Sequence, residues 1–148
     1  EIEYDERDRK VRETDPVSHD VVYGYDAANN QTSLTDELGR TVLFGYDRLN
    51  RQTTMTDPLG RVSTTSYDAV GNIRTFTDEL GRITTNIYDD RNRLLDTTDP
   101  LGGVIQLAYD DVGNVTSVTD PLGHGTVFEY DELTGPMASR NGWEHATT

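Results

Sequence analysis

Short runs of strand-forming residues alternate with polar turn segments along the chain. Residues 72–77 and 82–88 are two such runs, and both are rich in Thr and Ile. β-Branched and aromatic residues favour strands, and no stretch has the 3.6-residue period of a helix. The pattern therefore predicts an all-β chain with strands of ordinary length.

The turns recur with a fixed period of 21 residues. A Tyr-Asp pair keeps this step without variation at Tyr4 and Asp5, Tyr25 and Asp26, Tyr46 and Asp47, Tyr67 and Asp68, Tyr88 and Asp89, Tyr109 and Asp110, and Tyr130 and Asp131. Ten residues after the tyrosine comes a Thr-Asp pair, whose aspartates are Asp15, Asp36, Asp57, Asp78, Asp99 and Asp120. Each unit therefore has two turn sites, and the repeat predicts tandem β-hairpins.

Both turn sites suit a type I turn followed by a bulge. In the segment Asp57 to Gly60, the aspartate accepts backbone N–H bonds, Pro58 presets φ and the glycine takes a positive φ. The equivalent glycines are Gly39, Gly60, Gly81, Gly102 and Gly123. The Tyr-Asp turns that begin at Asp26, Asp47, Asp68, Asp89 and Asp110 have Gly or Asn at this place, and both tolerate the left-handed region. We expect these tyrosines, aspartates and glycines to be structural repeat positions.

Short turns make consecutive strands antiparallel neighbours, which predicts a continuous meander of roughly twelve strands. Equivalent tyrosines are then two strands apart, so they pack against the intervening strand instead of stacking ring on ring. A twisted sheet of this width curls or closes. The edge strands carry no visible protection, which indicates part of a longer array.

The repeats divide the chain into two parts. Residues 1–133 contain six complete repeats and the start of a seventh. Residues 134–148 depart from the pattern through Gly135 and Pro136 towards Trp143. This tail is either a degenerate cap or a transition to a following domain.

Composition narrows the classes of partner. Apolar residues make up 33% of the chain and the mean hydropathy is −0.70, which suits a thin architecture. The net charge of −14 disfavours nucleic acid and anionic membranes as partners. The absence of Cys excludes disulfides and thiolate metal sites. No apolar stretch is long enough to insert into a membrane, and any export signal is expected outside this segment.

At this point a family resemblance emerges. The motif from Tyr67 to Asn72, followed by Thr77 to Arg82, resembles the YD repeat of the Rhs family, and the resemblance covers residues 4 to about 133. That family includes bacterial polymorphic toxins, toxin-complex B and C components, wall-associated proteins and teneurins. The resemblance implies an exported or cell-surface bacterial protein with a spiral β-sheet shell, which in the toxins encloses a C-terminal toxic polypeptide. The self-cleaving end of such shells has no equivalent after Asp131, so autoproteolysis is not expected here.

No catalytic, cofactor or metal site is predicted. The aspartates lack the EF-hand and calcium β-roll patterns, so turn structure explains them better than metal binding. His19, His124 and His145 fall at unrelated positions with neither zinc nor triad spacing. The repeated tyrosines could form a sugar platform, but packing between strands is the favoured interpretation.

Arginines also recur directly after the turns. They are Arg40, Arg61 and Arg82 after the Thr-Asp turns, and Arg9, Arg51 and Arg93 after the Tyr-Asp turns. They could hold an anionic ligand, but cross-strand pairing with the many acids is favoured.

The function predicted is that of a structural, non-enzymatic segment of an Rhs/YD-repeat shell that encapsulates a C-terminal toxin or another polypeptide. Its partners would be adjacent repeats, flanking domains and the enclosed cargo, without a cofactor. The alternative is a surface-displayed adhesion module that binds a glycan or a cell-surface protein.

Overall fold

The computed structural model describes residues 1–131 and 135–141, with the backbone alone at 131 and at 135–141. These residues form fourteen strands and no helix, so none of them belongs to a helix that could cross a membrane. The strands are β1 Ile2–Tyr4, β2 Lys10–Thr14, β3 Asp20–Tyr25, β4 Gln31–Thr35, β5 Thr41–Tyr46, β6 Gln52–Thr56, β7 Val62–Tyr67, β8 Ile73–Thr77, β9 Ile83–Tyr88, β10 Leu94–Thr98, β11 Val104–Tyr109, β12 Val115–Thr119, β13 Gly125–Asp131 and β14 Gly135–Asn141.

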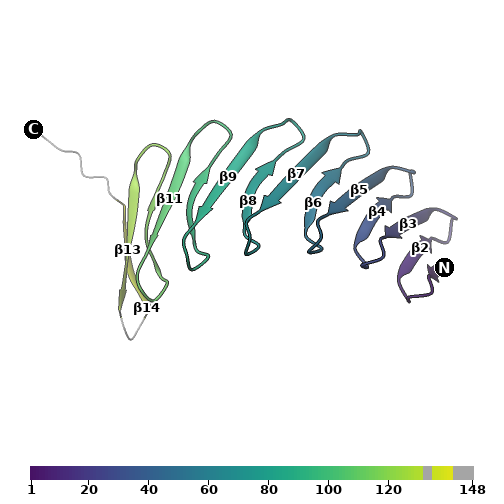
Figure 1. The fold of residues 1–148 in the computed structure, drawn as a ribbon, viewed down its shortest axis with the longest axis horizontal. Helices are drawn as coiled ribbons and strands as arrows, with labels where there is room; N and C mark the ends of the chain where they lie inside the picture. The colour runs from purple at the N-terminus through teal and green to yellow at the C-terminus, as the bar shows by residue number, and fades with distance from the viewer. Residues whose placement is uncertain (132–134, 142–148) are drawn as a thin grey trace, which may run out of the picture. The chain divides into compact units, whose positions relative to one another are not determined.

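Consecutive strands pair antiparallel in each of two compact units. The first unit comprises residues 1–66 and 76–82, and the second comprises residues 67–75 and 83–148. In the first unit, β1 to β7 pair in chain order, and in the second unit β9 to β14 do the same. Figure 1 shows the hairpins following one another along the chain. The predicted all-β meander of hairpin repeats is confirmed, with fourteen strands instead of roughly twelve because β13 and β14 follow the sixth repeat.

The two kinds of hairpin have different ladders. Across a Tyr-Asp turn, β3 and β4 pair from Val22 with Thr35 to Tyr25 with Gln31, and the register shifts just before Tyr25. Across a Thr-Asp turn, β2 and β3 make only three pairs, all close to the turn, from Thr14 with Asp20 to Arg12 with Val22. The backbone ladder between successive repeats therefore stops short of the Tyr-Asp end.

Little of the molecule is fully buried. Among residues 1–130, whose side chains the structure describes, no hydrophobic residue is buried, and Ser63 is the one buried polar residue, at 5% exposure. Most strand residues are half-buried. Each unit must therefore be stabilised by strand pairing and by contacts between neighbouring repeats, because its described residues provide no central core.

The tail continues the strand pattern as far as it is described. β14 pairs with β13 from Asp131 with Gly135 to Thr126 with Asn141. Trp143 and His145 lie outside the described residues. Whether residues 134–148 form a cap or a transition therefore stays a prediction.

Candidate functional site: two rows of aspartate turns

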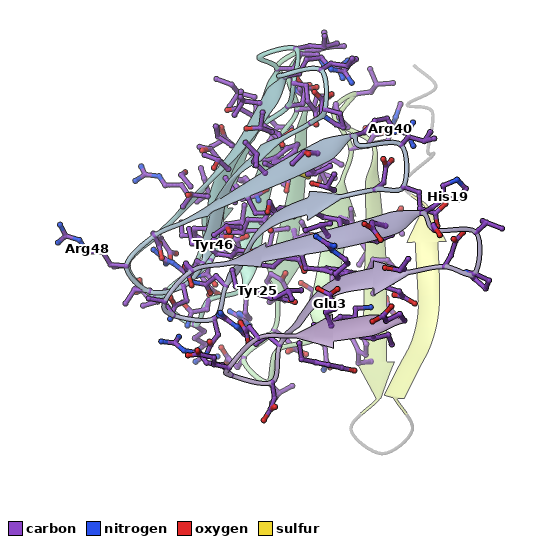
Figure 2. All side chains as sticks on the ribbon, turned by 90° about the vertical axis from the view of Figure 1, so that its right-hand side faces the viewer. Glu3, His19, Tyr25, Arg40, Tyr46 and Arg48 are labelled. Carbon is purple, nitrogen blue, oxygen red and sulfur yellow. The ribbon has the colours of Figure 1, made fainter. Side chains whose placement is uncertain are left out.

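The two turns of each repeat lie at opposite ends of the strands. Figure 2 shows His19 and Arg40, from Thr-Asp turns, at one end and Arg48, from a Tyr-Asp turn, at the other. We call these two series the Thr-Asp row and the Tyr-Asp row. The Thr-Asp row begins at Asp15 and the Tyr-Asp row at Asp5.

All twelve described turns share one hydrogen-bonding pattern. In the turn that begins at Asp57, the aspartate N–H donates to the carbonyl of Arg61 (2.9 Å), and the Gly60 N–H donates to the carbonyl of Asp57 (2.9 Å). The Asp57 Oδ1 atom accepts from the backbone N–H groups of Leu59 and Arg61, each at 2.9 Å. One carboxylate oxygen therefore satisfies two backbone donors that the turn leaves unpaired.

The fourth residue of each turn adopts a positive φ. Gly60 has a φ of 80° and Asn50 has a φ of 60°. The same conformation occurs at Asp8, Ser18, Asn29, Gly39, Gly71, Gly81, Asn92, Gly102, Gly113 and Gly123. This region is costly for residues with a Cβ and least costly for Gly, followed by Asn and Asp.

Except at Gly103, where there is no side chain, the side chain of the fifth residue holds the second carboxylate oxygen. Arg51 Nε donates to Asp47 Oδ2 at 2.7 Å, and the Asn30 amide donates to Asp26 Oδ2 at 2.8 Å. His124 Nδ1 lies 2.9 Å from Asp120 Oδ2. The repeated arginines thus pair with the aspartate of their own turn, four residues earlier. The sequence had favoured pairing with acids on neighbouring strands.

These contacts lower the pKa of eleven turn aspartates. The side chain and backbone of Arg9 lower the pKa of Asp5 to about 2. At Asp110, desolvation raises the pKa, but hydrogen bonds from Asn114 and the turn backbone outweigh it, so the net shift is downward. The ionised form is therefore the one that the turn stabilises.

Four of the repeated tyrosines, Tyr25, Tyr46, Tyr88 and Tyr109, connect their repeat to the one before it. The Tyr46 hydroxyl donates to the backbone carbonyl of Gln31 at 2.8 Å, and the Tyr109 hydroxyl donates to that of Leu94 at 2.8 Å. The equivalent bonds of Tyr25 and Tyr88 reach the carbonyls of Lys10 and Ile73, each at 3.1 Å. Each bond spans fifteen residues and lies at the end where the ladder between repeats stops. The tyrosine hydroxyl thus replaces a missing backbone donor.

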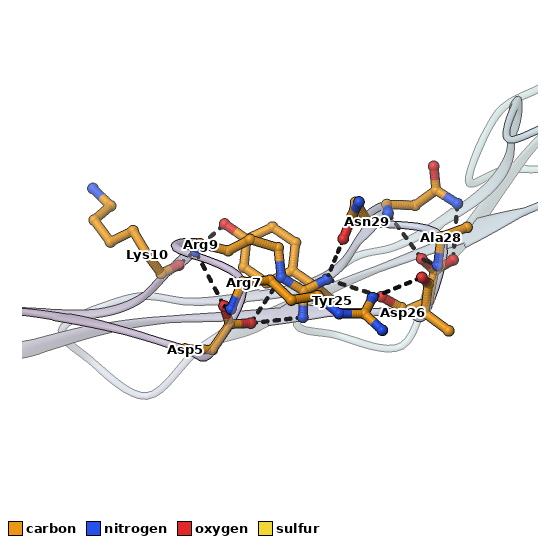
Figure 3. Close-up of polar contacts among 10 residues, drawn as sticks. Asp5, Arg7, Arg9, Lys10, Tyr25, Asp26, Ala28 and Asn29 are labelled. Carbon is orange, nitrogen blue, oxygen red and sulfur yellow. Dashed lines mark hydrogen bonds and ion pairs between the residues drawn. The ribbon is translucent and has the colours of Figure 1, made fainter.

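Side chains of the Tyr-Asp row also bridge successive turns. Arg9 Nη1 donates to the Asp26 carbonyl (2.9 Å) and to Asn29 Oδ1 (3.0 Å), and its guanidinium lies 4.7 Å from the centroid of the Tyr25 ring (Figure 3). Arg7 adds a bond to the Ala27 carbonyl at 2.8 Å. A single arginine thus closes its own turn, covers the next tyrosine and holds the next turn.

The fifth turn residue alternates between Arg and Asn along this row, as Arg9, Asn30, Arg51, Asn72, Arg93 and Asn114. Bridges to the next turn are made by Arg9, Asn30, Asn72 and Arg93. The Asn30 amide donates to Asn50 Oδ1 at 2.9 Å, and the Asn72 amide donates to Asn92 Oδ1 at 3.1 Å. Arg93 Nη1 donates to the Asp110 carbonyl at 2.9 Å. Both residue types therefore join one turn to the next by a side-chain hydrogen bond.

The Thr-Asp row has no such bridges among its first four turns. From Asp15 to Arg82, the side-chain hydrogen bonds of the described turn residues stay within their own turn. Side chains of the first two turns of this row nevertheless lie near one another. A carboxylate oxygen of Glu37 lies within 4.8 Å of a carboxylate oxygen of Asp15 and of a ring nitrogen of His19. Sequence spacing had left His19 without partners.

Sequence reasoning thus places the turn residues but misses the bridges. Arg9 and Asn30 differ in type, so their common role is visible only as an alternation with twice the basic period. Tyr46 was expected to pack between strands, and its hydroxyl bond to Gln31 adds a polar contact to that interpretation. His145 lies outside the described residues.

Solved structures of toxin complexes share this fold. The crystal structures of TcdB2-TccC3-Cdc42 and TcdB2-TccC3 match 82% of this chain with TM-scores of 0.67 and 0.66, each at 20% identity. The Photorhabdus luminescens Tc holotoxin pore matches the same share with a TM-score of 0.66 and 20% identity. The chain spans 7% of the length of each of these chains, and the likeness shows a common fold. No curated protein matches it.

The fold and the two rows of turns define a tandem β-hairpin-repeat protein. The sequence pattern of the RHS Repeat family matches residues 25–62, 67–108 and 109–134. The chain belongs to this family and is a structural repeat segment.

Proposed function

We propose that this chain is part of the wall of an exported shell that encloses a polypeptide, with the toxin of a bacterial complex as the favoured cargo. The observation that carries the proposal is the way the repeats are joined. Within each of the two units, strand pairing, tyrosine hydroxyls and turn bridges link successive repeats, while residues 1–130 contain no buried hydrophobic side chain. Such units extend by adding neighbours, which suits a wall better than a globule.

Family membership and fold support the same role. The chain has the fold of solved toxin-complex structures, and its family resemblance includes shells that enclose a toxic polypeptide. The role is passive in chemical terms. Each turn carboxylate is engaged by its own turn backbone and is repeated in every unit, whereas a catalytic carboxylate normally occupies a singular pocket.

The test uses the full-length protein that contains this chain. We expect a polypeptide that stays with the shell on native gels, separates only on denaturation and is identified by mass spectrometry. It should also resist protease in the native protein. A double variant, Gly60→Val with Gly81→Val, should expose it to protease, whereas the strand variant Gly125→Val should leave it protected.

An intact full-length chain with nothing enclosed would contradict the proposal and would favour a surface-displayed adhesion module. An associated polypeptide that protease digests at the same rate with and without the shell would also contradict it. Enclosure, and not mere association, is the property being tested.

A further inference from the structure

Three metal-ligating groups from two successive Thr-Asp turns come together in the first unit. The groups are the carboxylate of Asp15, the imidazole of His19 and the carboxylate of Glu37, and their ligand atoms all lie within 4.8 Å of one another. Asp15 and His19 belong to one turn, and Glu37 is the second residue of the next. The sequence separates Glu37 from His19 by an entire strand pair, so only the fold brings them together.

Two of the three ligands are already held in place. Asp15 Oδ1 accepts the backbone N–H groups of Val17 and His19 at 2.8 and 2.9 Å, which leaves Oδ2 directed at His19 Nδ1, 3.1 Å away. An aspartate carboxylate is ionised at neutral pH, so Asp15 can act as an anionic ligand. The side chains of His19 and Asp15 are 55% and 31% exposed, so solvent reaches the site.

We propose that Asp15, His19 and Glu37 bind a divalent transition-metal ion, with Zn²⁺ as the ion that fits these donors best. One imidazole nitrogen and two carboxylate oxygens are a donor set that zinc accepts, and water would complete the tetrahedron. Bonds of about 2.0–2.2 Å require ligand atoms roughly 3.3 Å apart. Rotation of the exposed Glu37 side chain provides this closure. Mg²⁺ and Ca²⁺ prefer all-oxygen sites and would bind less well.

The ion would join two turns that share no hydrogen bond. In the Tyr-Asp row, Arg9 and Asn30 bridge successive turns, whereas the side-chain hydrogen bonds of the first two Thr-Asp turns stay within each turn. A metal held by Asp15 and His19 on one side and by Glu37 on the other would supply that bridge. This role does not depend on what the repeats enclose.

Other turns provide matched controls and a way to build a second site. Arg61 occupies the place of His19 two repeats later. The hydrogen bond and charge of Asp57 raise the pKa of Arg61, and the charge of Glu79 adds to this shift, so Glu79 lies close enough to interact. His124 repeats the contact of His19 by lying 2.9 Å from Asp120 Oδ2. The pair at His124 has no third ligand among the described residues.

Calorimetric titration of the full chain with ZnCl₂ tests the site. We expect saturable binding of one Zn²⁺, at least tenfold weaker in His19→Ala and in Glu37→Gln and unchanged in His124→Ala. Arg61→His should raise the stoichiometry to two, because it places an imidazole between Asp57 and Glu79. Zn²⁺ should also raise the urea midpoint of the native chain but not that of His19→Ala.

Several results would overturn the proposal. They are the lack of saturable binding, binding that His19→Ala leaves unaltered, and equal loss in His19→Ala and His124→Ala. Circular dichroism of each variant checks that it folds, and His19→Gln provides a second substitution of the same imidazole. An equal response to Mg²⁺ would show attraction to a general acidic surface in place of an imidazole site.

Discussion

The Tyr-Asp row and the Thr-Asp row use the same turn but differ in what lies beyond it. In both rows one aspartate oxygen accepts from the turn backbone, and the side chain of the fifth residue, where it has one, holds the other oxygen. In the Tyr-Asp row that fifth residue can reach the next turn, as Arg9 and Asn30 do, whereas the side-chain hydrogen bonds of the first four Thr-Asp turns stay within each turn. The same local chemistry therefore yields a row of linked turns and a row whose first turns are separate.

The difference follows from the ladders. Between repeats, β2 and β3 pair only next to the Thr-Asp turn, so backbone bonds already hold the repeats together at that end. At the Tyr-Asp end the backbone ladder has stopped. There the Tyr25 hydroxyl donates to the Lys10 carbonyl, and Arg9 donates to the Asp26 carbonyl of the next turn. Successive repeats are therefore joined by backbone hydrogen bonds at the Thr-Asp end and by side-chain hydrogen bonds at the Tyr-Asp end.

Acid should have the largest effect, because it acts on both rows at once. Eleven turn aspartates have a lowered pKa, and that of Asp5 falls to about 2. A carboxyl with a lower pKa in the folded state adds stability above its unfolded pKa of about 4, and this stability is lost as the pH falls through the folded value. Urea midpoints at constant ionic strength should be level above about pH 5 and fall steeply between about pH 4 and pH 2. A level midpoint down to pH 2 would contradict the role of the carboxylates.

A β-branched residue at the fourth turn position should have the next largest effect. Gly60 has a φ of 80°, so Gly60→Val should lower the free energy of unfolding by more than about 1 kcal/mol. Gly125 in β13 has no positive φ and no atom within 4 Å of an added Cβ, so Gly125→Val is the matched control. Urea denaturation measures both. Equal losses in the two variants would show that conformation at the turn is not the cause.

Removal of one tyrosine hydroxyl tests the bonds that replace the ladder. Tyr46→Phe should cost about 1 kcal/mol, because the Gln31 carbonyl loses its donor. Tyr4 occupies the same repeat position, is 60% exposed, and its hydroxyl makes no hydrogen bond with the described residues. Tyr4→Phe should therefore be nearly neutral in the same urea denaturation series. Loss of similar size in both variants would refute a specific role for the bond.

The smallest effect should separate the two rows directly. A double-mutant cycle on Asn30 and Asn50 should show a coupling of about 0.5 kcal/mol, because their amides are bonded at 2.9 Å. A second cycle on Arg61 and Glu79 should show less, because these two residues interact through exposed charges. Urea denaturation of the single and double alanine variants gives both values. Equal coupling in the two rows would remove the distinction between them.

The hairpins can be predicted from the sequence because each turn is held by hydrogen bonds among five consecutive residues. Asp57 and Gly60 lie three residues apart and satisfy a single short backbone segment, so their pattern is visible in every unit. The bridges are not visible in this way. Tyr46 donates to Gln31 fifteen residues earlier, at the end of β4 and β5 where their backbone ladder has stopped. Likewise, Glu37 meets His19 only because two turns lie side by side, which depends on how the strands pair.

The fifth residue of the Tyr-Asp turns alternates between Arg and Asn, so the sequence pattern repeats fully only every two hairpins. The residues are Arg9, Asn30, Arg51, Asn72, Arg93 and Asn114. Duplication or deletion of one 21-residue unit would place two arginines, or two asparagines, in adjacent repeats and interrupt the order of the bridges. Duplication or deletion of two units would preserve that order throughout. We therefore expect relatives that differ in length by an even number of units to keep the alternation intact.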